Sequence, residues 1–370
     1  MTQQSSYSQT TAMLAITKAS LRALLRSPSA VIFSFGFPLI FIMVFGFIGS
    51  GGTTIRIGLA PGADTGAANL VYRQLKQYKT LRIMDLPEAQ MRQDLEKGRI
   101  TAILDIQPTG IDSFPKYRVT VQTSTAGADK IGLLQTTLND LVRVLDARAR
   151  PGMPSYAAIE TPPPLPGRVY RTIDFILPGQ LGFSLLSAGV FGVAFLFFNL
   201  RQTLVLKRFF ATPISRTHIL LGEGLSRIIF QMITAVVILL VGHFAFGFTL
   251  VHGVVTFVEL LVLSFLGLMV FMGFGFVVSG LAKNESVIPP FANLVTLPQF
   301  LLAGTFFSID NFPRWLQPVC NILPLTHLNN AMRNVAFEGN HLIDCGKELG
   351  VLALWALGVY ALAVRVFRWE

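Results

Sequence analysis

The segment from residue 199 to residue 216 combines cations, aromatic rings and a turn in a pattern suited to binding. Its functional residues are, in chain order, Arg201, Lys207, Arg208, Phe209, Phe210, Thr212, Pro213 and Arg216. The helical stretch ends at the proline, because the residue before a proline is driven out of the α region. A short basic amphipathic helix binds a membrane surface or a partner protein. We therefore predict a docking segment here.

Motifs for catalysis and for ATP binding are absent from the sequence. It has no G-x-x-x-x-G-K-[ST] phosphate loop, no H-E-x-x-H and no G-x-S-x-G, so we predict no site that cradles ATP phosphates or performs hydrolysis. Four histidines lack the spacing of metal ligands: His243, His252, His327 and His341. We expect no catalytic residue, metal or cofactor on this chain.

A second basic pattern precedes the first apolar run. Lys18, Arg22 and Arg26 recur every four residues and share one helical stripe, and Pro28 ends the pattern. One interpretation is a helix lying in the inner membrane interface with its cations at lipid headgroups. The other is that these residues are ordinary charges that set the topology. The sequence leaves both interpretations open.

The composition places most of the chain in lipid. Hydrophobic residues make up 52% and charged residues 14%, and the mean hydropathy is +0.57, which is too apolar for a soluble globular protein. The net charge of +10 then indicates cytoplasmic loops and anionic headgroups rather than nucleic acid.

Six apolar runs are long enough to cross a bilayer, which takes about 20 residues as a helix. They cover residues 30–48, 173–200, 228–248, 254–281, 287–307 and 349–367. The first run is too long for a signal peptide and lacks a cleavage site, so we expect it to remain as a span. Lys and Arg gather in alternate loops, which predicts a multi-pass inner-membrane protein with both termini in the cytoplasm.

The long insert between the first two spans changes to a mixed-charge composition. Strand patterns at residues 55–60, 81–86, 100–106 and 117–123 alternate with helical periods at 67–78, 88–97 and 131–149. This alternation predicts a small α/β domain outside the cytoplasm. A proline-rich stretch at 161–167 predicts a stiff connector leading back to the membrane.

Ionisable residues near the spans predict local pairing rather than chemistry. Glu223 and Arg227 are four residues apart, which favours an ion pair on one helical face. Glu259 lies early in the fourth span, where it either lines a polar path or is solvated near the interface.

Two stretches resemble a known family. Residues 207–216 followed by Ile-Leu-Leu-Gly at 219–222 resemble the cytoplasmic loop of ABC type-2 exporter permeases. Residues 297–307, 312–316, 323–327 and 331–334, with Gly339 after them, resemble the family's fifth helix and the re-entrant helices that follow it. The matches occur in the expected order and, together with six spans and one large outer domain, cover most of the chain.

The resemblance implies a polytopic α-helical fold of six transmembrane helices with an inserted α/β domain. It divides the chain into a tail with an interfacial helix (1–29), a first span (30–50), the extracytoplasmic domain (51–171) and a five-helix domain (172–370). The last contains a coupling loop (199–222) and a re-entrant segment (308–345). It further implies export of a hydrophobic or amphipathic substrate, driven by ATP and Mg on a separate ABC ATPase subunit.

The implied assembly is a homodimer or a pair with a paralogous permease, in contact with membrane lipids and with a periplasmic adaptor as a further candidate partner. Pathway residues by family position are Phe183, Phe191, Phe291, Leu294, Phe300 and Leu301. The alternatives are a secondary transporter or a membrane-embedded lipid-processing protein. Cys320 and Cys345 both fall on the outer side of this topology, where they form either a disulfide or two buried free thiols.

Overall fold

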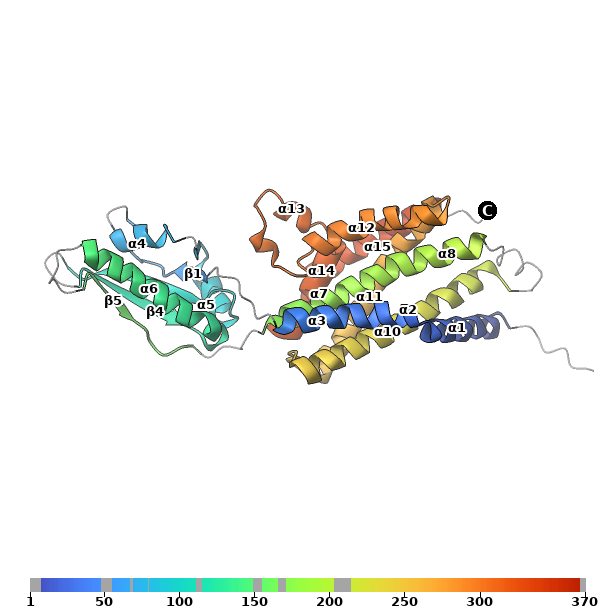
Figure 1. Cartoon of the computed structure of the whole chain (residues 1–370), viewed down its shortest axis with the longest axis horizontal. Coiled ribbons are helices and arrows are strands. Elements are labelled where there is room, and N and C mark those ends of the chain that lie inside the picture. Colours follow the sequence, from blue (N-terminus) through green and yellow to red (C-terminus); the bar gives the residue numbers. More distant parts are fainter. Residues whose placement is uncertain are drawn as a thin grey trace, which may run out of the picture. The chain divides into compact units, whose positions relative to one another are not determined.

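The chain folds into two compact units. A computed structural model describes residues 8–47, 55–66, 69–78, 80–110, 115–148, 155–165, 171–202 and 214–366. The first unit, which we name the helical unit, combines Met1–Gly49 with Thr172–Glu370, and the α/β unit is Ser50–Arg171. Figure 1 shows the ribbon of both units, with many of the helices and strands labelled.

The helices of the helical unit follow the apolar runs of the sequence. Their bounds are α1 Gln9–Arg26, α2 Pro28–Val31, α3 Phe37–Phe47, α7 Thr172–Ser187, α8 Val193–Gln202, α10 Arg216–Phe246, α11 Val254–Leu281, α12 Ile288–Leu302, α13 Gln317–Cys320, α14 Pro324–Arg333 and α15 Gly346–Val366. Turns of π-helix join α2 to α3 at Ile32–Gly36 and α7 to α8 at Ala188–Gly192.

Within the described residues, four helical stretches are long and apolar enough to cross a membrane. They are Thr172–Gln202, Thr217–Phe246, Val254–Leu281 and Leu342–Val366. The prediction of a mostly helical chain with apolar spans is confirmed in this form. The predicted first span falls on α2 to α3, where the apolar helix is Ser34–Val44.

The predicted fifth span is shorter than expected. Helix α12 has 15 residues, which is about 22 Å of helix, against a hydrocarbon thickness of about 30 Å. It ends at Leu302 because Gly304, with φ of 69°, adopts the left-handed conformation that terminates helices. Residues 303–307, which the sequence assigned to the span, are therefore outside the helix.

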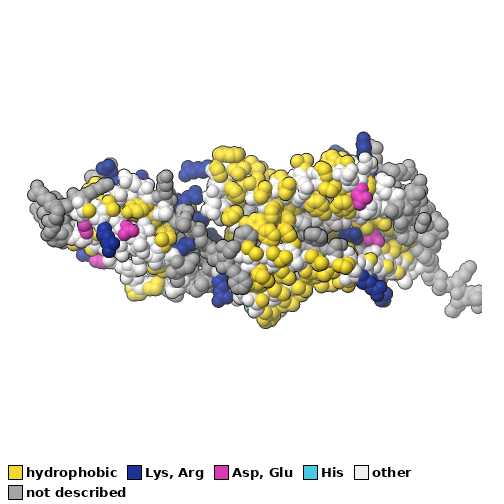
Figure 2. Space-filling model, in the orientation of Figure 1, with side chains coloured by type: hydrophobic (Ala, Val, Ile, Leu, Met, Phe, Trp, Pro, Cys, Tyr) yellow, Lys and Arg dark blue, Asp and Glu magenta, His cyan; other side chains and the backbone are white. Residues whose placement is uncertain are grey.

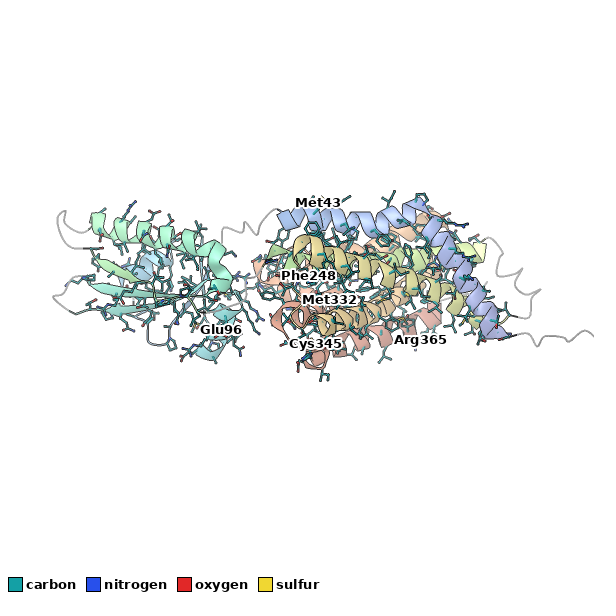
Figure 3. The ribbon with its side chains drawn as sticks, turned by 90° about the horizontal axis from the view of Figure 1, so that it is seen from below. Met43, Glu96, Phe248, Met332, Cys345 and Arg365 are labelled. Carbon is teal, nitrogen blue, oxygen red and sulfur yellow. The ribbon has the colours of Figure 1, made fainter. Side chains whose placement is uncertain are left out.

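The chain between α12 and α15 turns back into the helical unit. Helix α14 packs against α7, α11, α12 and α15, and its Leu325, Leu328 and Met332 are completely buried. Figure 3 labels Met332 among these helices. Arg333 at its end donates hydrogen bonds to the carbonyl oxygens of Phe175, at 3.0 Å, and Gly304, at 2.6 Å. These bonds fasten the segment to α7.

The α/β unit contains one mixed five-stranded sheet. Its strands are β1 Ile55–Leu59, β2 Leu81–Met84, β3 Ala102–Pro108, β4 Tyr117–Thr123 and β5 Ala157–Glu160. The order across the sheet is β2-β1-β3-β4-β5, with only β3 and β4 antiparallel. The small α/β domain is thus confirmed as a fold, with β5 as a strand that the sequence pattern missed.

Three helices cover the sheet on both faces. Their bounds are α4 Leu70–Leu75, α5 Glu88–Glu96 and α6 Ala128–Arg148. Helices α4 and α6 share one core with Ile57 and Leu104, while α5 packs on the other face beside Ile103. Figure 1 shows α6 lying across the strands.

The proline-rich connector is bonded to the chain at the end of β4 through Leu165. The Leu165 amide donates to the Thr123 carbonyl oxygen at 2.8 Å, and the Thr125 amide donates to the Leu165 carbonyl oxygen at 3.0 Å. Leu165 also packs against the core around α5. The stretch was predicted as a connector throughout, and these bonds fix one of its residues, Leu165, to the end of β4.

Candidate functional site

The predicted coupling loop can be followed only at its two ends. Residues 203–213 lie outside the described residues, so the structure does not place Lys207, Arg208, Phe209, Phe210, Thr212 or Pro213. Arg216 is the first residue of α10, and its side chain is also outside the description. The helices that lead into and out of the loop, α8 and α10, are described.

The entry to the loop is bonded to the end of another helix. Arg201, in the last turn of α8, donates to the carbonyl oxygens of Ala282, at 2.8 Å, and Ser279, at 3.3 Å. These carbonyls belong to the last turn of α11 and its cap, where the backbone lacks helical partners and the helix dipole favours a cation. Arg201 was predicted among the docking residues. In the structure its guanidinium bonds to carbonyl oxygens of the same chain.

The loop ends at the N-terminus of α10, which is capped by a serine. The Ser215 hydroxyl accepts from the His218 amide at 3.4 Å, as an N-cap does. The Ser215 amide in turn donates to Gln9 Oε1 at 2.9 Å. Gln9 is the first residue of α1, so a hydrogen bond to its side chain joins the loop exit to α1.

Helix α1 packs along α10 through a row of polar contacts, which we call the seam. The Thr17 hydroxyl lies 3.0 Å from the Gly222 carbonyl oxygen, and the Ser20 hydroxyl donates to Glu223 Oε1 at 2.7 Å. The helices approach so closely that a Cβ on Gly222 would lie 2.9 Å from the Met13 carbonyl oxygen. Glycine is therefore required here, as in other closely packed membrane helices. The sequence had no signal for Thr17 and Ser20, because their partners lie about 200 residues away.

The predicted pair of Glu223 and Arg227 is present and extends the seam. Arg227 Nη1 lies 3.3 Å from Glu223 Oε2. Arg227 Nε also donates to the Gly192 carbonyl oxygen at 3.2 Å. Gly192 is the last residue of the π-helical turn between α7 and α8, so the chain of bonds runs from α1 through α10 to α7.

The outward face of α1 carries the predicted basic stripe. Lys18, Arg22 and Arg26 are exposed, and Leu14 and Leu25 beside them are 56% and 48% exposed. In Figure 3, α1 turns steeply away from the direction of α3. A helix with cations and exposed leucines on one face has the composition of an interfacial helix.

The candidate pathway residues separate into two groups. Phe183 of α7 and Phe300 of α12 pack together with their ring centroids 4.2 Å apart and their planes tilted by 45°. Their cluster includes three aromatic residues that sequence reasoning missed, namely Phe37, Phe41 and Phe306. These side chains come from α3, α7, α12 and the turn after α12.

The other candidates lie apart from this cluster. Phe291, Leu294 and Leu301 are on the exposed side of α12, where Leu294 is 71% exposed. Phe191 lies in the π-helical turn and packs on the core of the helical unit. Figure 2 shows apolar side chains over much of the visible surface of the helical unit. The structure thus pairs Phe183 with Phe300 and does not bring all six together.

Comparison with known proteins identifies the family of the chain. A family model for ABC-2 family transporter protein matches residues 28–365. The chain belongs to this family. The linearmycin resistance permease protein LnrN of Bacillus subtilis is 22% identical over 96% of this chain and 99% of its own length. A probable multidrug ABC transporter permease of Escherichia coli, YbhR, is 23% identical over 42% of this chain and 40% of that protein.

A longer relative matches only in part. The ABC transporter G family member 20 of Dictyostelium discoideum is 26% identical over 52% of this chain. The matched part covers 26% of that protein, so this chain spans about a quarter of its length.

As an ABC-2 family member, the chain is a permease subunit of an ABC transporter. It is not the catalytic subunit, and ATP hydrolysis belongs to a partner ABC ATPase.

The cysteines of this ABC-2 chain are free thiols in the structure. Cys320 and Cys345 are both buried. The Cys345 sulfur faces the Ala331 carbonyl oxygen at 4.0 Å. Of the two alternatives left by the sequence, the structure contains the pair of buried thiols and no bridge.

Glu259, His243, His327 and His341 have partners within the chain. Glu259 Oε1 lies 3.1 Å from His341 Nδ1 and accepts from the Leu342 amide at 3.1 Å, which ties α11 to the start of the last span. His243 and His327 each pair with a backbone carbonyl oxygen. Among the described residues, no group of three or more His, Cys, Asp or Glu has the geometry of a metal site.

Proposed function

We propose that this chain is the membrane half of an exporter whose partner ATPase docks on the loop 199–222. The observation that supports this docking site best is the anchoring of both ends of the loop. Arg201 ties the entry to α11, and the bonds from Ser215 to Arg227 tie the exit to α1, α10 and α7. Motion of an ATPase docked on a loop anchored in this way would be transmitted to several helices at once.

The proposed topology has six spans in the inner membrane, with both termini in the cytoplasm and the α/β unit outside. Two of the spans would be formed by α2 to α3 and by α12 with the turn that follows it. The exposed cations of α1, with Leu14 and Leu25, support a position in the inner interface, where anionic lipid headgroups attract Lys and Arg.

The proposed pathway lies between two copies of this chain, or between this chain and a paralogous permease. Helix α12 supports this, because its buried face packs in the unit while Phe291, Leu294 and Leu301 remain exposed. Phe300 of the same helix packs against Phe183 of α7. An aromatic and aliphatic lining suits a hydrophobic or amphipathic substrate. ATP and Mg would bind the partner ATPase, and a periplasmic adaptor is a further candidate partner.

The test compares aromatic and charged residues of the loop. Phe209→Ala and Phe210→Ala would be purified with the ATPase, next to Lys207→Ala as the matched control. Loss of a buried aromatic anchor costs about 2 kcal/mol or more at an interface, whereas a rim charge contributes less. We expect both aromatic variants to lose ATPase co-purification or substrate-stimulated hydrolysis, and Lys207→Ala to keep them. Wild-type assembly and stimulation in both aromatic variants would refute docking on this loop.

A further inference from the structure

Two helices of the helical unit are interrupted by π-helical turns that share the same ending. One turn, Ile32–Gly36, lies between α2 and α3, and the other, Ala188–Gly192, lies between α7 and α8. Each turn ends in a Phe-Gly pair, at residues 35–36 and 191–192. Single turns of π-helix inside longer helices are frequent at functional sites and are a known cause of helix kinks.

Both π-turns lie beside the same level of α10. Phe35 packs edge-on against Phe230 of α10, with ring centroids 6.0 Å apart and ring planes at 83°. Arg227 Nε of α10 donates to the Gly192 carbonyl oxygen at 3.2 Å. Arg227 and Phe230 are less than one helical turn apart. The two π-turns therefore flank α10 at one level, about 16 to 21 Å along the helix from its start at the loop.

The glycines that end the two turns are not required for close packing. Among the described residues, a Cβ on Gly192 would meet no atom within 4 Å, and one on Gly36 would meet only Ile32 Cγ2 of the same turn, at 3.7 Å. By contrast, a Cβ on Gly189 would lie 2.7 Å from the Phe271 Cβ atom of α11. Gly36 and Gly192 therefore supply backbone freedom, because glycine adopts a wider range of conformations than other residues.

The π-turn between α7 and α8 is held in place from two sides. A Cβ on Gly275 of α11 would lie 2.5 Å from the Gly189 carbonyl oxygen, so the backbones of α11 and the turn are in close contact. From the other side, Arg227 of α10 bonds to Gly192. Hinges are a few residues that absorb a change in backbone angles while the packed segments beside them stay rigid. A turn held between α10 and α11 is a fixed point for such a change.

We propose that the two π-turns form a hinge that transmits motion of the loop 199–222 to α3 and α7. On the loop side lie α8, which leads into the loop, and α2, which follows α1. On the other side, Phe37 of α3 and Phe183 of α7 contact each other, with ring centroids 5.6 Å apart. These rings belong to the aromatic cluster of the proposed pathway. The inference rests on the proposed docking of the ATPase on this loop, because the ATPase supplies the motion.

The test measures the bend of α8 in the complex of the full-length chain with its ATPase, in lipid nanodiscs. Spin labels are attached at Gln202→Cys, at the loop end of α8, and at Leu240→Cys, on an exposed position of α10, in a complex that carries one labelled copy. The native Cys320 and Cys345 are buried and stay unlabelled. A bend of about 20° over the length of α8 moves its end by about 5 Å. Trapping with ATP and vanadate should shift the distance between the labels by about this amount.

The decisive variant carries both Gly36→Ala and Gly192→Ala. There is room for both methyl groups, and alanine favours regular helix over glycine about fivefold per residue. We expect the shift in label distance and the substrate stimulation of ATP hydrolysis to fall to about half or less of their wild-type values. Co-purification of the ATPase and the temperature midpoint should be unchanged. Gly358→Ala on α15 is the matched control, because its Cβ also meets no described atom within 4 Å.

The hinge and the docking site are tested by different readouts. Wild-type co-purification and stimulation in Phe209→Ala and Phe210→Ala refute docking on the loop. A wild-type shift in label distance in the double glycine variant refutes the hinge alone. The hinge is also overturned if trapping leaves the label distance of the wild-type complex unchanged. Loss of ATPase co-purification in the double glycine variant would overturn it too, since the glycines would then serve assembly.

Discussion

The α/β unit and the helical unit both contain an apolar core, but they differ in the polar contacts that join their elements. In the α/β unit the sheet and two helices enclose a continuous aliphatic core, including Ile57, Leu104 and Leu138, which are at most 2% exposed. In the helical unit the contacts between helices include cations bonded to carbonyl oxygens, at Arg201, Arg227 and Arg333.

The difference follows from the solvent around each unit. Moving apolar surface out of water stabilises the α/β unit. Lipid is as apolar as leucine, so helices in a bilayer associate through close packing and interhelical hydrogen bonds. Substitutions in the α/β unit should therefore act through lost apolar volume, and substitutions in the helical unit through lost bonds or lost proximity.

The largest effect is expected from a cavity in the aliphatic core. Leu104→Ala removes a completely buried side chain and should destabilise the α/β unit by about 2 to 5 kcal/mol. Limited proteolysis of the full-length chain would detect this as faster cleavage within Ser50–Arg171. Leu133→Ala is the matched control, because Leu133 is 46% exposed on α6. Equal cleavage rates in the two variants would show that the apolar core does not determine the stability of the α/β unit.

Next in size should be the loss of the cation at the loop entry. Arg201→Gln leaves the last carbonyls of α11 without this donor, and a hydrogen bond to a charged group contributes about 1.5 to 3 kcal/mol. We expect a lower temperature midpoint for the purified complex and weaker substrate-stimulated ATP hydrolysis. Arg201→Lys, which keeps one cation, should lie between. A variant that loses stimulation at an unchanged midpoint would instead assign Arg201 to the ATPase contact.

A smaller effect is expected from one added methyl group in the seam. Gly222→Ala places a Cβ 2.9 Å from the Met13 carbonyl oxygen, so α1 must shift, at a cost of about 1 to 3 kcal/mol. Gly224→Ala on the same helix meets only a methionine methyl at 3.7 Å and serves as the control. Cross-linking between cysteines placed on α1 and α10 should fall in Gly222→Ala alone. Unchanged cross-linking would show that the two helices accommodate the added methyl group without separating.

The smallest effect should come from a single neutral hydroxyl. Thr17→Val keeps the shape of the side chain and removes its bond to the Gly222 carbonyl oxygen. Interhelical bonds of this kind average about 0.6 kcal/mol in membrane proteins. The temperature midpoint of the complex should drop slightly, and Thr11→Val, at an exposed position of α1, should leave it unchanged. A drop as large as that of Gly222→Ala would show that the hydroxyl, and not proximity, dominates the seam.

Local patterns were enough to predict most of the elements. The apolar runs at 254–281 and 349–367 nearly coincide with helices, and the strand pattern at 117–123 coincides with β4. The ion pair of Glu223 and Arg227 was also predictable, because both residues lie on one helical face. Strand β5 was missed because only four residues form it, next to a proline-rich stretch.

The sequence by itself determined that the chain is a membrane protein of the ABC-2 type, because hydropathy and the two motif stretches are local properties of the chain. Only the tertiary structure decided which residues act together. Arg201 bonds to carbonyls about 80 positions away, Ser215 meets Gln9, and Thr17 meets Gly222. Such contacts depend on how helices cross and how close they come, which no spacing within one segment records.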